Sequence, residues 1–491
     1  MILVKLLEKC DISIRFNDDV FAGLSNEYLF LQTDSRLVKK RDLFVAIKGE
    51  KVDAFIFAQD ILRYCNVFVY EVSPEKNNQA KSLAERFPSV ALLGVSSVVT
   101  FLQELTAIQI TYWYEQKPSA KLIAISGCNG KTTTKEMLSH ILSKQFQNKY
   151  IFTEKNNNNH LGVPLTLLKI HPPSTEVAVV EFGSNHPGEM KVLCDVSYPN
   201  VGITTNIGYA HMEFFKDLNE VFKEEALIYY TVMQRTNNKG FFLINEDDEY
   251  LRTLPRFVNV KGFSFKDKGA DFYYELTGYQ EIQISYLREK KCVKIKNNHI
   301  MGEHNFCNLA NSFILADTLF PGNPAHFLEM CSSFIPSQNR SQWLKYRDLK
   351  TVGVETLKEK IFLDAYNANP SSMEVALKSF KSHLEGINVP IDEVLLCLGD
   401  MKELGTNEGQ FHTQLGFVVK NLGFKNIVYT GAMGEFFRDG LGFSPIKIFK
   451  NLEEAKVNSE FLKKAFYENQ IIFIKASRSL QLERLIDITK G

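Results

Sequence analysis

The sequence predicts an α/β fold of three domains: a small N-terminal α/β domain over residues 1–96, a central P-loop ATPase-like domain with a parallel or mixed sheet over 97–338, and a C-terminal Rossmann-like domain over 339–491. Three observations predict this fold. The length of 491 residues corresponds to about three domains of ordinary size. Apolar strand-like runs alternate with helical segments along much of the chain. At 121–142 a strand, a glycine turn and a helix follow one another directly.

The composition excludes several classes of protein. Lys and Arg together number 57, as do Asp and Glu, so no net positive charge would attract nucleic acid. No apolar run reaches the length that membrane insertion requires. The eight cysteines are scattered without a C-x-x-C pair, and charged residues come too early for a signal peptide. A cytoplasmic protein is therefore expected, without a disulfide framework or a zinc site.

The elements that predict the N-terminal and central domains are short apolar runs. Residues 42–48 and 67–70 are strand-like, and a helix over about 98–115 leads to the glycine turn. Further on, 177–182 and 201–205 are strand-like, and each ends in a polar loop that contains glycine. Loops that follow parallel strands meet at one edge of the sheet, so these loops should converge on one ligand. Residues 240–300 have more strand character than the rest, as an extension of the sheet would.

The alternation of strand, loop and helix restarts after Arg340. Four apolar runs predict strands in the last domain, at 361–364, 394–398, 426–429 and 471–474. Each of them leads into a loop, as in a Rossmann-like sheet.

The most informative segment is the turn Ser-Gly-Cys-Asn-Gly-Lys-Thr-Thr at 126–133. Glycines allow backbone N–H groups to surround phosphate oxygens, and the N-terminus of the following helix adds favourable partial charge. A lysine at 131 can reach the terminal phosphates, and a hydroxyl at 132 can bind Mg²⁺. An ordinary glycine turn is the alternative, but it does not require the lysine and the threonines. The residues predicted to bind ATP here are Gly127, Asn129, Gly130, Lys131, Thr132 and Thr133.

Two further side chains at strand ends are candidates for a magnesium site. Glu181 ends one apolar strand, and His211 lies in the loop after the next. Mg²⁺ prefers oxygen, so Glu181 is the stronger candidate. A histidine in the core without any ligand is the alternative for His211.

Several other polar loops follow apolar strands. The run 156–164 is rich in asparagine and by composition alone is more typical of a structural turn. The loop 364–372 has more hydrogen-bonding groups than a connector needs, and 399–405 and 475–478 also follow strands. Each could be an ordinary cap, but three such loops on one domain indicate a binding surface.

Together these segments resemble the Mur ligases, the amide-bond ligases of peptidoglycan synthesis. The resemblance covers most of residues 30–480, and the motifs that carry it are Gly-x-x-Gly-Lys-Thr-Thr at 127–133, the segments 156–164 and 181–189, Gly302-Glu-His-Asn305 with Asn308, Arg340-Ser-Gln342, the segment 364–373, Gly399-Asp-Met-x-Glu-Leu-Gly405 with His412, and Lys475-x-Ser-Arg478. Within the family, the segment 364–373 resembles the members that add D-alanyl-D-alanine.

The resemblance implies an enzyme with ATP and Mg²⁺ as cofactors. ATP would phosphorylate the terminal carboxylate of UDP-N-acetylmuramoyl-tripeptide, and the amine of D-alanyl-D-alanine would attack the acyl phosphate. A monomer is expected. The residues implied are, for catalysis, Lys131, His211, Glu225 and Arg340; for the nucleotide, also Asn305, Asn308 and Asp364; for the metals, Thr132, Glu181, His211 and Glu225; and for the substrates, Ser35, Arg36, Asn159, Tyr366, Asn367, Asn369, Ser371, Lys475 and Arg478.

The chain departs from the family pattern in two places. Fourteen residues after His211, where the family carries a carbamylated lysine, the chain has Glu225, which could provide a carboxylate directly. In the N-terminal domain, Arg41 replaces a usual glycine and Asp53-Ala-Phe-Ile replaces Asp-Gly-His-Asp; Phe214 and Ala476 also replace glycines. Two alternatives therefore stay open: a related ligase with another carboxylate and amine, and a nucleotide-binding protein without catalytic activity. A P-loop kinase or GTPase would not explain the segment 364–373.

Overall fold

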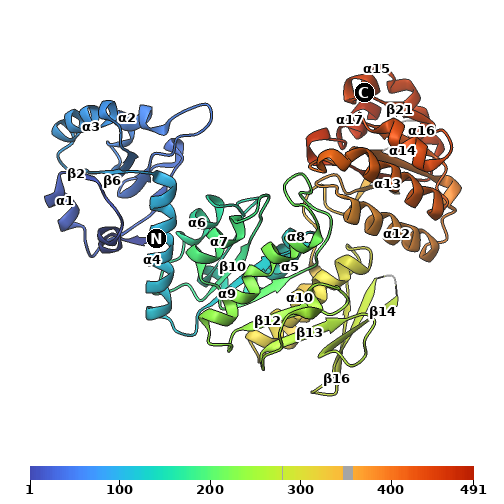
Figure 1. The fold of residues 1–491 in the computed structure, drawn as a ribbon, viewed down its shortest axis with the longest axis horizontal. Coiled ribbons are helices and arrows are strands. Elements are labelled where there is room, and N and C mark those ends of the chain that lie inside the picture. The colour runs from blue at the N-terminus through green and yellow to red at the C-terminus, as the bar shows by residue number, and fades with distance from the viewer. Residues whose placement is uncertain (279, 347–357, 491) are drawn as a thin grey trace.

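The computed structural model describes residues 1–278, 280–346 and 358–490, which form three lobes in chain order. The N-terminal and C-terminal lobes lie at opposite ends of the central lobe (Figure 1). Each lobe contains a sheet flanked by helices, so the predicted α/β fold of three domains is confirmed. The predicted boundaries after residues 96 and 338 stay predictions. In the described residues, no helix is both long enough and apolar enough to cross a membrane.

The N-terminal lobe is built on a sheet in the order β2-β7-β6-β5-β4. Its strands are parallel except β2 at one edge. Val67 and Val69 face one buried cluster and Phe68 and Tyr70 the other, as the alternation of a strand that is covered on both faces requires. The bounds are β1 (Ile2–Leu3), β2 (Ile14–Phe16), α1 (Asp18–Gly23), β3 (Tyr28–Leu29), β4 (Leu31–Gln32), β5 (Asp42–Val45), α2 (Ala58–Ile61), β6 (Cys65–Glu71), α3 (Pro74–Arg86) and β7 (Ala91–Val95).

Helix α4 (Val98–Gln116) belongs to two cores at once. The Ser97 hydroxyl begins it by accepting the N–H of Thr100 at 3.2 Å. Its first half packs Phe101 and Leu105 into the N-terminal core, and its second half packs Trp113 into the central core. The indole N–H of Trp113 donates to the backbone oxygen of Thr175 at 2.8 Å. The helix therefore fixes how the first two lobes meet.

The central sheet has the strand order β16-β15-β14-β13-β12-β11-β8-β10-β9. Strands β9 to β14 and β8 are parallel, and β14, β15 and β16 form antiparallel pairs, which confirms the strand-rich character expected for 240–300. The bounds are β8 (Lys121–Ser126), β9 (Tyr150–Phe152), β10 (Val177–Glu181), β11 (Val201–Thr204), β12 (Phe241–Asn245), β13 (Val260–Ser264), β14 (Phe272–Gly278), β15 (Glu281–Tyr286) and β16 (Lys291–Lys296).

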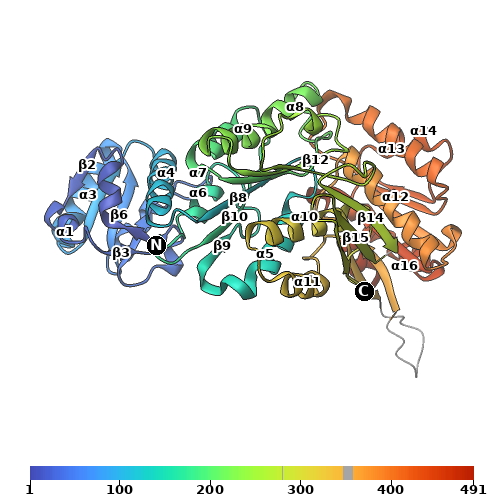
Figure 2. The same ribbon diagram turned by 90° about the horizontal axis from the view of Figure 1, so that it is seen from below.

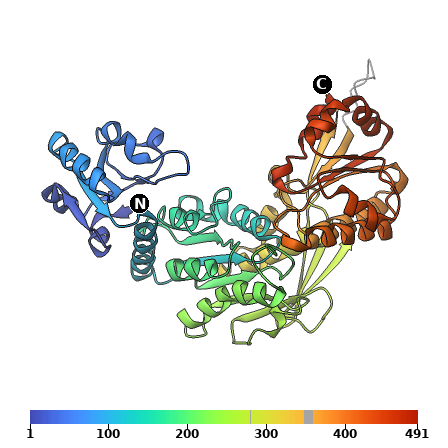
Figure 3. The same cartoon turned by 45° about the horizontal axis from the view of Figure 1, so that its top comes forward.

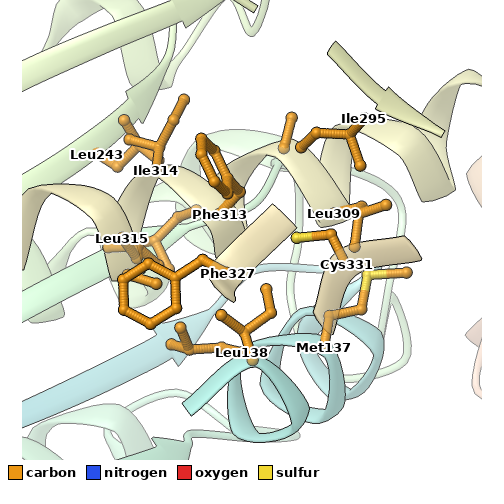
Figure 4. Close-up of a cluster of buried hydrophobic side chains, with 14 of the residues drawn as sticks. Met137, Leu138, Leu243, Ile295, Leu309, Phe313, Ile314, Leu315, Phe327 and Cys331 are labelled. Atoms are coloured by element: carbon orange, nitrogen blue, oxygen red, sulfur yellow. The ribbon is translucent and has the colours of Figure 1, made fainter. Parts of the chain in front are cut away.

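Helices cover both faces of this sheet. One group is α5 (Lys131–Phe146), α10 (Glu303–Leu319) and α11 (Pro324–Ser333); the other contains α6 (Gly162–Leu167), α7 (Glu189–Ser197), α8 (Leu218–Glu225) and α9 (Leu227–Arg235). Figure 2 shows the two groups on opposite sides of the strands. The first group packs against β12 and β16 through Met137, Leu138, Leu243, Ile295 and Phe313 (Figure 4). Because α5 is buried against the sheet and α10, its N-terminus is held at the carboxyl ends of the parallel strands.

The C-terminal lobe has the strand order β17-β18-β22-β19-β20-β21, all parallel except β17 at the edge. Its sheet lies between two apolar clusters, as predicted for a Rossmann-like domain. Figure 3 shows this lobe beside the end of the central lobe remote from the N-terminal lobe. The bounds are β17 (Gln342–Tyr346), β18 (Lys358–Leu363), α12 (Pro370–Gly386), β19 (Val394–Gly399), α13 (Glu408–Leu422), β20 (Ile427–Thr430), α14 (Gly434–Leu441), β21 (Lys447–Phe449), α15 (Leu452–Val457), α16 (Ser459–Glu468), β22 (Ile471–Lys475) and α17 (Arg484–Lys490).

Truncating Trp113 tests the role of α4. We expect Trp113→Ala to lower the free energy of unfolding by about 3–5 kcal/mol, because it leaves a cavity in the core and removes the bond to Thr175. Urea unfolding followed by circular dichroism measures the shift. Phe417→Ala, which removes a half-exposed aromatic ring, is the control and should change stability little. Equal shifts in the two variants would contradict a special role for α4.

Candidate functional site

A cavity of about 940 Å³ lies between the central and C-terminal lobes. Loops that follow β8, β10 and β11 line it from one side, and α12 with the loop before it lines it from the other. The predicted convergence of the strand-end loops is therefore confirmed. The predicted site residues that line the cavity are Asn129, Gly130, Lys131, Thr132, Thr133, Asn159, Glu181, His211, Asn305, Asn308, Arg340, Asp364, Tyr366, Asn367, Ser371 and Lys475.

The phosphate loop connects β8 to α5 through two glycines with positive φ. The φ angle is 117° at Gly127 and 85° at Gly130. A Cβ atom would lie 2.2 Å from the Thr205 hydroxyl at the first position and 2.8 Å from Asn308 Oδ1 at the second. At Gly127, where the backbone N of Thr205 would lie 2.8 Å away, glycine is required on steric and conformational grounds; at Gly130 the positive φ is the reason. Helix α5 begins immediately after the loop, so its free N–H groups lie at the cavity wall, where an anion would be stabilised.

Two charged side chains, Lys131 and Glu225, are hydrogen-bonded to the backbone of the phosphate loop. The Lys131 ammonium donates to the backbone oxygen of Gly127, so the side chain folds back over the loop. Glu225, at the end of α8, accepts the N–H of Gly127 at 2.8 Å. Burial raises the pKa of the Glu225 carboxyl, and Lys131 opposes that shift. A second cavity of about 10 Å³, which Lys131, His211 and Glu225 help to line, lies beneath the loop.

The side chains around Glu181 fit a magnesium ion. One carboxylate oxygen, Oε1, accepts from the Thr132 hydroxyl and from Asn158 Nδ2, both at 2.9 Å. The other, Oε2, is buried and has no hydrogen-bond partner among the described residues. An unpaired buried carboxylate oxygen beside a hydroxyl is the donor set of a hard cation that also binds phosphate. In the described part of the chain, no three His, Cys, Asp or Glu side chains are grouped to hold a metal by themselves.

Arg340 lies on the other side of the cavity. Its guanidinium stacks on the ring of Tyr366 at 3.8 Å from the ring centroid, which fixes its direction. Beside it, Lys475 and Asp364 form an ion pair at 2.6 Å. Burial alone would raise the pKa of Asp364, but the Lys475 ammonium holds it below its usual range. Lys475 also donates to the backbone oxygen of Asn367 at 3.0 Å, so its ammonium fixes the shape of this loop.

Direct contacts connect the two sides of the cavity. Asn369 Nδ2 donates to Asn129 Oδ1 of the phosphate loop at 2.8 Å. The same Asn369 accepts the N–H of Ser372 and begins α12. The N–H of Tyr209 donates to the Ser371 hydroxyl at 3.3 Å. These hydrogen bonds therefore hold the start of α12 next to the phosphate loop and next to the loop after β11.

Comparison with known proteins gives the family. Residues 125–316 match the model described as Mur ligase middle domain, and residues 352–478 match the one described as Mur ligase, glutamate ligase domain. The chain belongs to the Mur ligase family. Together the two matches cover more than half of the chain.

Relatives match over nearly the whole length. The UDP-N-acetylmuramoyl-tripeptide–D-alanyl-D-alanine ligase of Bacillus subtilis (strain 168) is 29% identical over 468 residues, which is 92% of this chain and 91% of the relative. The ligase of the same name from Borreliella burgdorferi is 29% identical over 515 residues, covering 97% and 98%. Crystal structure I of MurF from Acinetobacter baumannii is 25% identical with a TM-score of 0.73, covering 94% of this chain and 93% of that one.

Several predicted residues lie outside the main cavity, and their roles stay predictions. Gly127, Glu225 and Asn369 are not part of its lining: Gly127 belongs to the phosphate loop, and Glu225 and Asn369 are hydrogen-bonded to that loop. Arg478 pairs with Glu483. Ser35 and Arg36 belong to the N-terminal lobe, where Arg36 pairs with Asp34 at 2.6 Å. Asn159, although it lines the cavity, accepts the N–H of Gly162 at 2.8 Å at the start of α6.

Three residues that the structure places at the site lie in motifs quoted in the sequence analysis, which gave them no role of their own. Asn158 bonds to Glu181, although composition favoured a purely structural loop at 156–164. His304 lines the cavity and contacts the Ser379 hydroxyl of α12 at 3.2 Å, and desolvation lowers its pKa to about 4. Glu403 contacts His211 from the C-terminal lobe. Each of the three belongs to one of those motifs, but its partner is distant in the sequence, so no pattern of adjacent residues predicted the contact.

Removing the charge at Glu181 tests the metal site. We expect Glu181→Gln to weaken ADP binding in the presence of Mg²⁺ by about tenfold to a hundredfold, because the cation loses its buried carboxylate. Isothermal titration with Mg²⁺ and with EDTA measures the two affinities. Glu154→Gln, at an exposed position of the same lobe, is the control. A loss of the same size with and without Mg²⁺ would contradict a metal role for Glu181.

Proposed function

We propose that the chain is an ATP-dependent ligase that joins D-alanyl-D-alanine to UDP-N-acetylmuramoyl-tripeptide through an acyl phosphate. One observation carries the proposal: the phosphate loop and the loop that ends in Asn369 face the same cavity and are hydrogen-bonded to each other. A nucleotide held by the first loop and an amine held by the second would meet in that cavity. The full-length match to ligases of this name supports the choice of substrates.

The chemistry that we propose has two steps. First, an oxygen of the peptide carboxylate attacks the γ-phosphorus of ATP; the bond between this phosphorus and the bridging oxygen breaks, and ADP leaves. Second, the amine nitrogen of the dipeptide attacks the acyl carbon; the carbon–oxygen bond to phosphate breaks, phosphate leaves, and the nitrogen gives up a proton. Both steps depend mainly on positioning and on cationic groups near the phosphates.

The residues of the central lobe are proposed to hold the nucleotide. The N–H groups of the loop 127–133 and the N-terminus of α5 would bind the phosphate oxygens, and Lys131 would extend from its present contact with Gly127 towards the terminal phosphates. Thr132 and Glu181 would hold Mg²⁺, which when bound neutralises charge on the phosphates. Asn305, on the first turn of α10, would contact the adenine, and Asn308, which lies against Gly130 of the phosphate loop, would also contact the nucleotide.

The residues of the C-terminal lobe are proposed to close the site. Arg340, held by Tyr366, would reach the γ-phosphate, and Asp364 would reach the ribose. Asn367, Asn369 and Ser371 would lie near the dipeptide. Lys475 would act mainly through Asp364 and Asn367, because its donors are directed at them.

The N-terminal lobe is proposed to hold the UDP-sugar through Ser35 and Arg36. In this lobe Arg41 has a φ of 73°, a value that glycine adopts more easily. The altered residues make a related ligase with another carboxylate and amine the second candidate. We further propose domain boundaries after residues 96 and 338, a monomer and a location in the cytoplasm.

The test of the function is phosphate release from ATP, measured with each substrate omitted in turn. We expect release only when ATP, UDP-N-acetylmuramoyl-tripeptide and D-alanyl-D-alanine are all present, because each step needs the product of the one before. Lys131→Ala is the control that excludes a contaminating ATPase. Release in the absence of both peptide substrates, or none with all three, would contradict the proposed function.

A second prediction concerns Glu225. We expect Glu225→Gln to lower kcat by about a hundredfold or more, because the amide can still accept the N–H of Gly127 while the charge near Lys131 is lost. Steady-state ligation kinetics measure the effect. Asn219→Ala, at an exposed position of the same helix, is the matched control. Turnover close to that of the unmodified protein would mean that the carboxylate has no part in the reaction.

A further inference from the structure

His211 and Glu403 contact each other across the boundary between the central and C-terminal lobes. His211 Nδ1 and Glu403 Oε2 are 2.6 Å apart, and their residues are 192 positions apart in the chain. The backbone also joins here, because the N–H of Glu213 donates to the backbone oxygen of Glu403 at 3.3 Å. We propose that Glu403 is a positioning residue for His211: the carboxylate of the C-terminal lobe orients the imidazole for the metal and phosphate end of the active site.

The backbone at this contact is held in an unusual conformation. His211 has a φ of 55° and Glu403 a φ of 63°, both in the left-handed region that costs a residue with a side chain about 1–2 kcal/mol. Such a conformation persists only where the surroundings impose it. Because both residues of this contact have such a conformation, we infer that the central lobe and the C-terminal lobe each hold their side of the contact in place.

The loop that carries Glu403 is held by its neighbours. The carboxylate of Asp400 accepts from the Tyr429 hydroxyl and from the N–H groups of Ala432 and Met433, at 3.0–3.1 Å. His412 Nε2 accepts the N–H of Met401 at 2.9 Å. These bonds fix the backbone on the N-terminal side of Glu403. Although its own side chain is half exposed, Glu403 therefore projects from a rigid base.

The contact determines which nitrogen of His211 is available. A carboxylate only accepts, so Nδ1 must carry a proton and donate it to Glu403. The neutral imidazole then has its lone pair on Nε2, and a ligand would meet that atom. His211 lines both the main cavity and the small cavity beneath the phosphate loop, next to Lys131 and Glu225. A histidine whose other nitrogen donates to a carboxylate is the usual arrangement of a metal ligand.

The inference extends the proposed function and rests on it. Because Glu403 belongs to the C-terminal lobe, the histidine is oriented only when the two lobes are engaged as they are here. The metal and phosphate end of the site would thus depend on the same lobe that supplies Arg340. A contact that merely holds the lobes together is the other possible role, and the test separates the two.

The test is a double-mutant cycle with Glu403→Ala, His211→Ala and the double variant. We expect each single variant to lower kcat/KM by about tenfold to a hundredfold, and the double variant to equal His211→Ala alone, because Glu403 acts through His211. Glu403→Gln, which keeps an acceptor oxygen, should lose less than Glu403→Ala. Glu435→Ala removes an exposed carboxylate of the same lobe and is the control. Additive losses, or full activity in either single variant, would overturn the proposal.

A binding measurement makes the test independent of turnover. Electron paramagnetic resonance of Mn²⁺ in the presence of ADP gives the metal affinity of each variant. We expect the affinity to fall by about tenfold to a hundredfold in Glu403→Ala and not to fall further from His211→Ala to the double variant. An unchanged Mn²⁺ affinity in Glu403→Ala would overturn the proposal. If the unmodified protein binds Mn²⁺ and ADP but does not ligate the three substrates, only the proposed function fails.

Discussion

The close approach of two loops at Gly127 is the constraint on which the site depends. The Thr205 hydroxyl donates to the backbone oxygen of Asn129 at 2.6 Å, and Asn206 Nδ2 donates to the same oxygen at 2.9 Å. A Cβ atom at Gly127 would lie 2.2 Å from that hydroxyl, so only glycine permits the approach. The loop after β11 thereby fixes the phosphate loop at Asn129, and the Glu225 carboxylate fixes it at the N–H of Gly127. What remains of the loop faces the cavity.

A loop held in this way provides a fixed point for the other lobe. The C-terminal lobe contacts it at Asn129 through Asn369, and contacts the loop after β11 at Tyr209 and His211. These three contacts are polar, and apolar packing is added to them, because Met301 of the central lobe is buried in the C-terminal core and Tyr209 packs on Phe411. The N-terminal lobe is joined differently, because α4 contributes side chains to both cores. The two junctions therefore differ in kind: one helix shared by two cores makes the first, and contacts between loops and side chains of separate lobes make the second.

The sequence predicts those parts of the site that depend on local signals. The strand, the glycine turn and the helix at 121–142 were predictable because each has its own pattern over adjacent residues. The same is true of the strands of the last lobe, which are short apolar runs. Pairings between distant residues have no such signal. The ion pair of Lys475 with Asp364, 111 residues earlier, and the hydrogen bond of Asn158 to Glu181 both join segments that are distant in the sequence.

The electrostatics of the phosphate loop follow from burial. Two carboxylates, Glu181 and Glu225, are buried beside a loop that would bind a polyanion, and Lys131 of that loop folds back onto its backbone. Burial of a carboxylate is costly unless a cation is near, and one lysine cannot neutralise two carboxylates and a triphosphate. A divalent cation that enters with the nucleotide resolves both problems, because it compensates the phosphates and the unpaired oxygen of Glu181 together. The arrangement therefore favours the metal–nucleotide complex over either component alone.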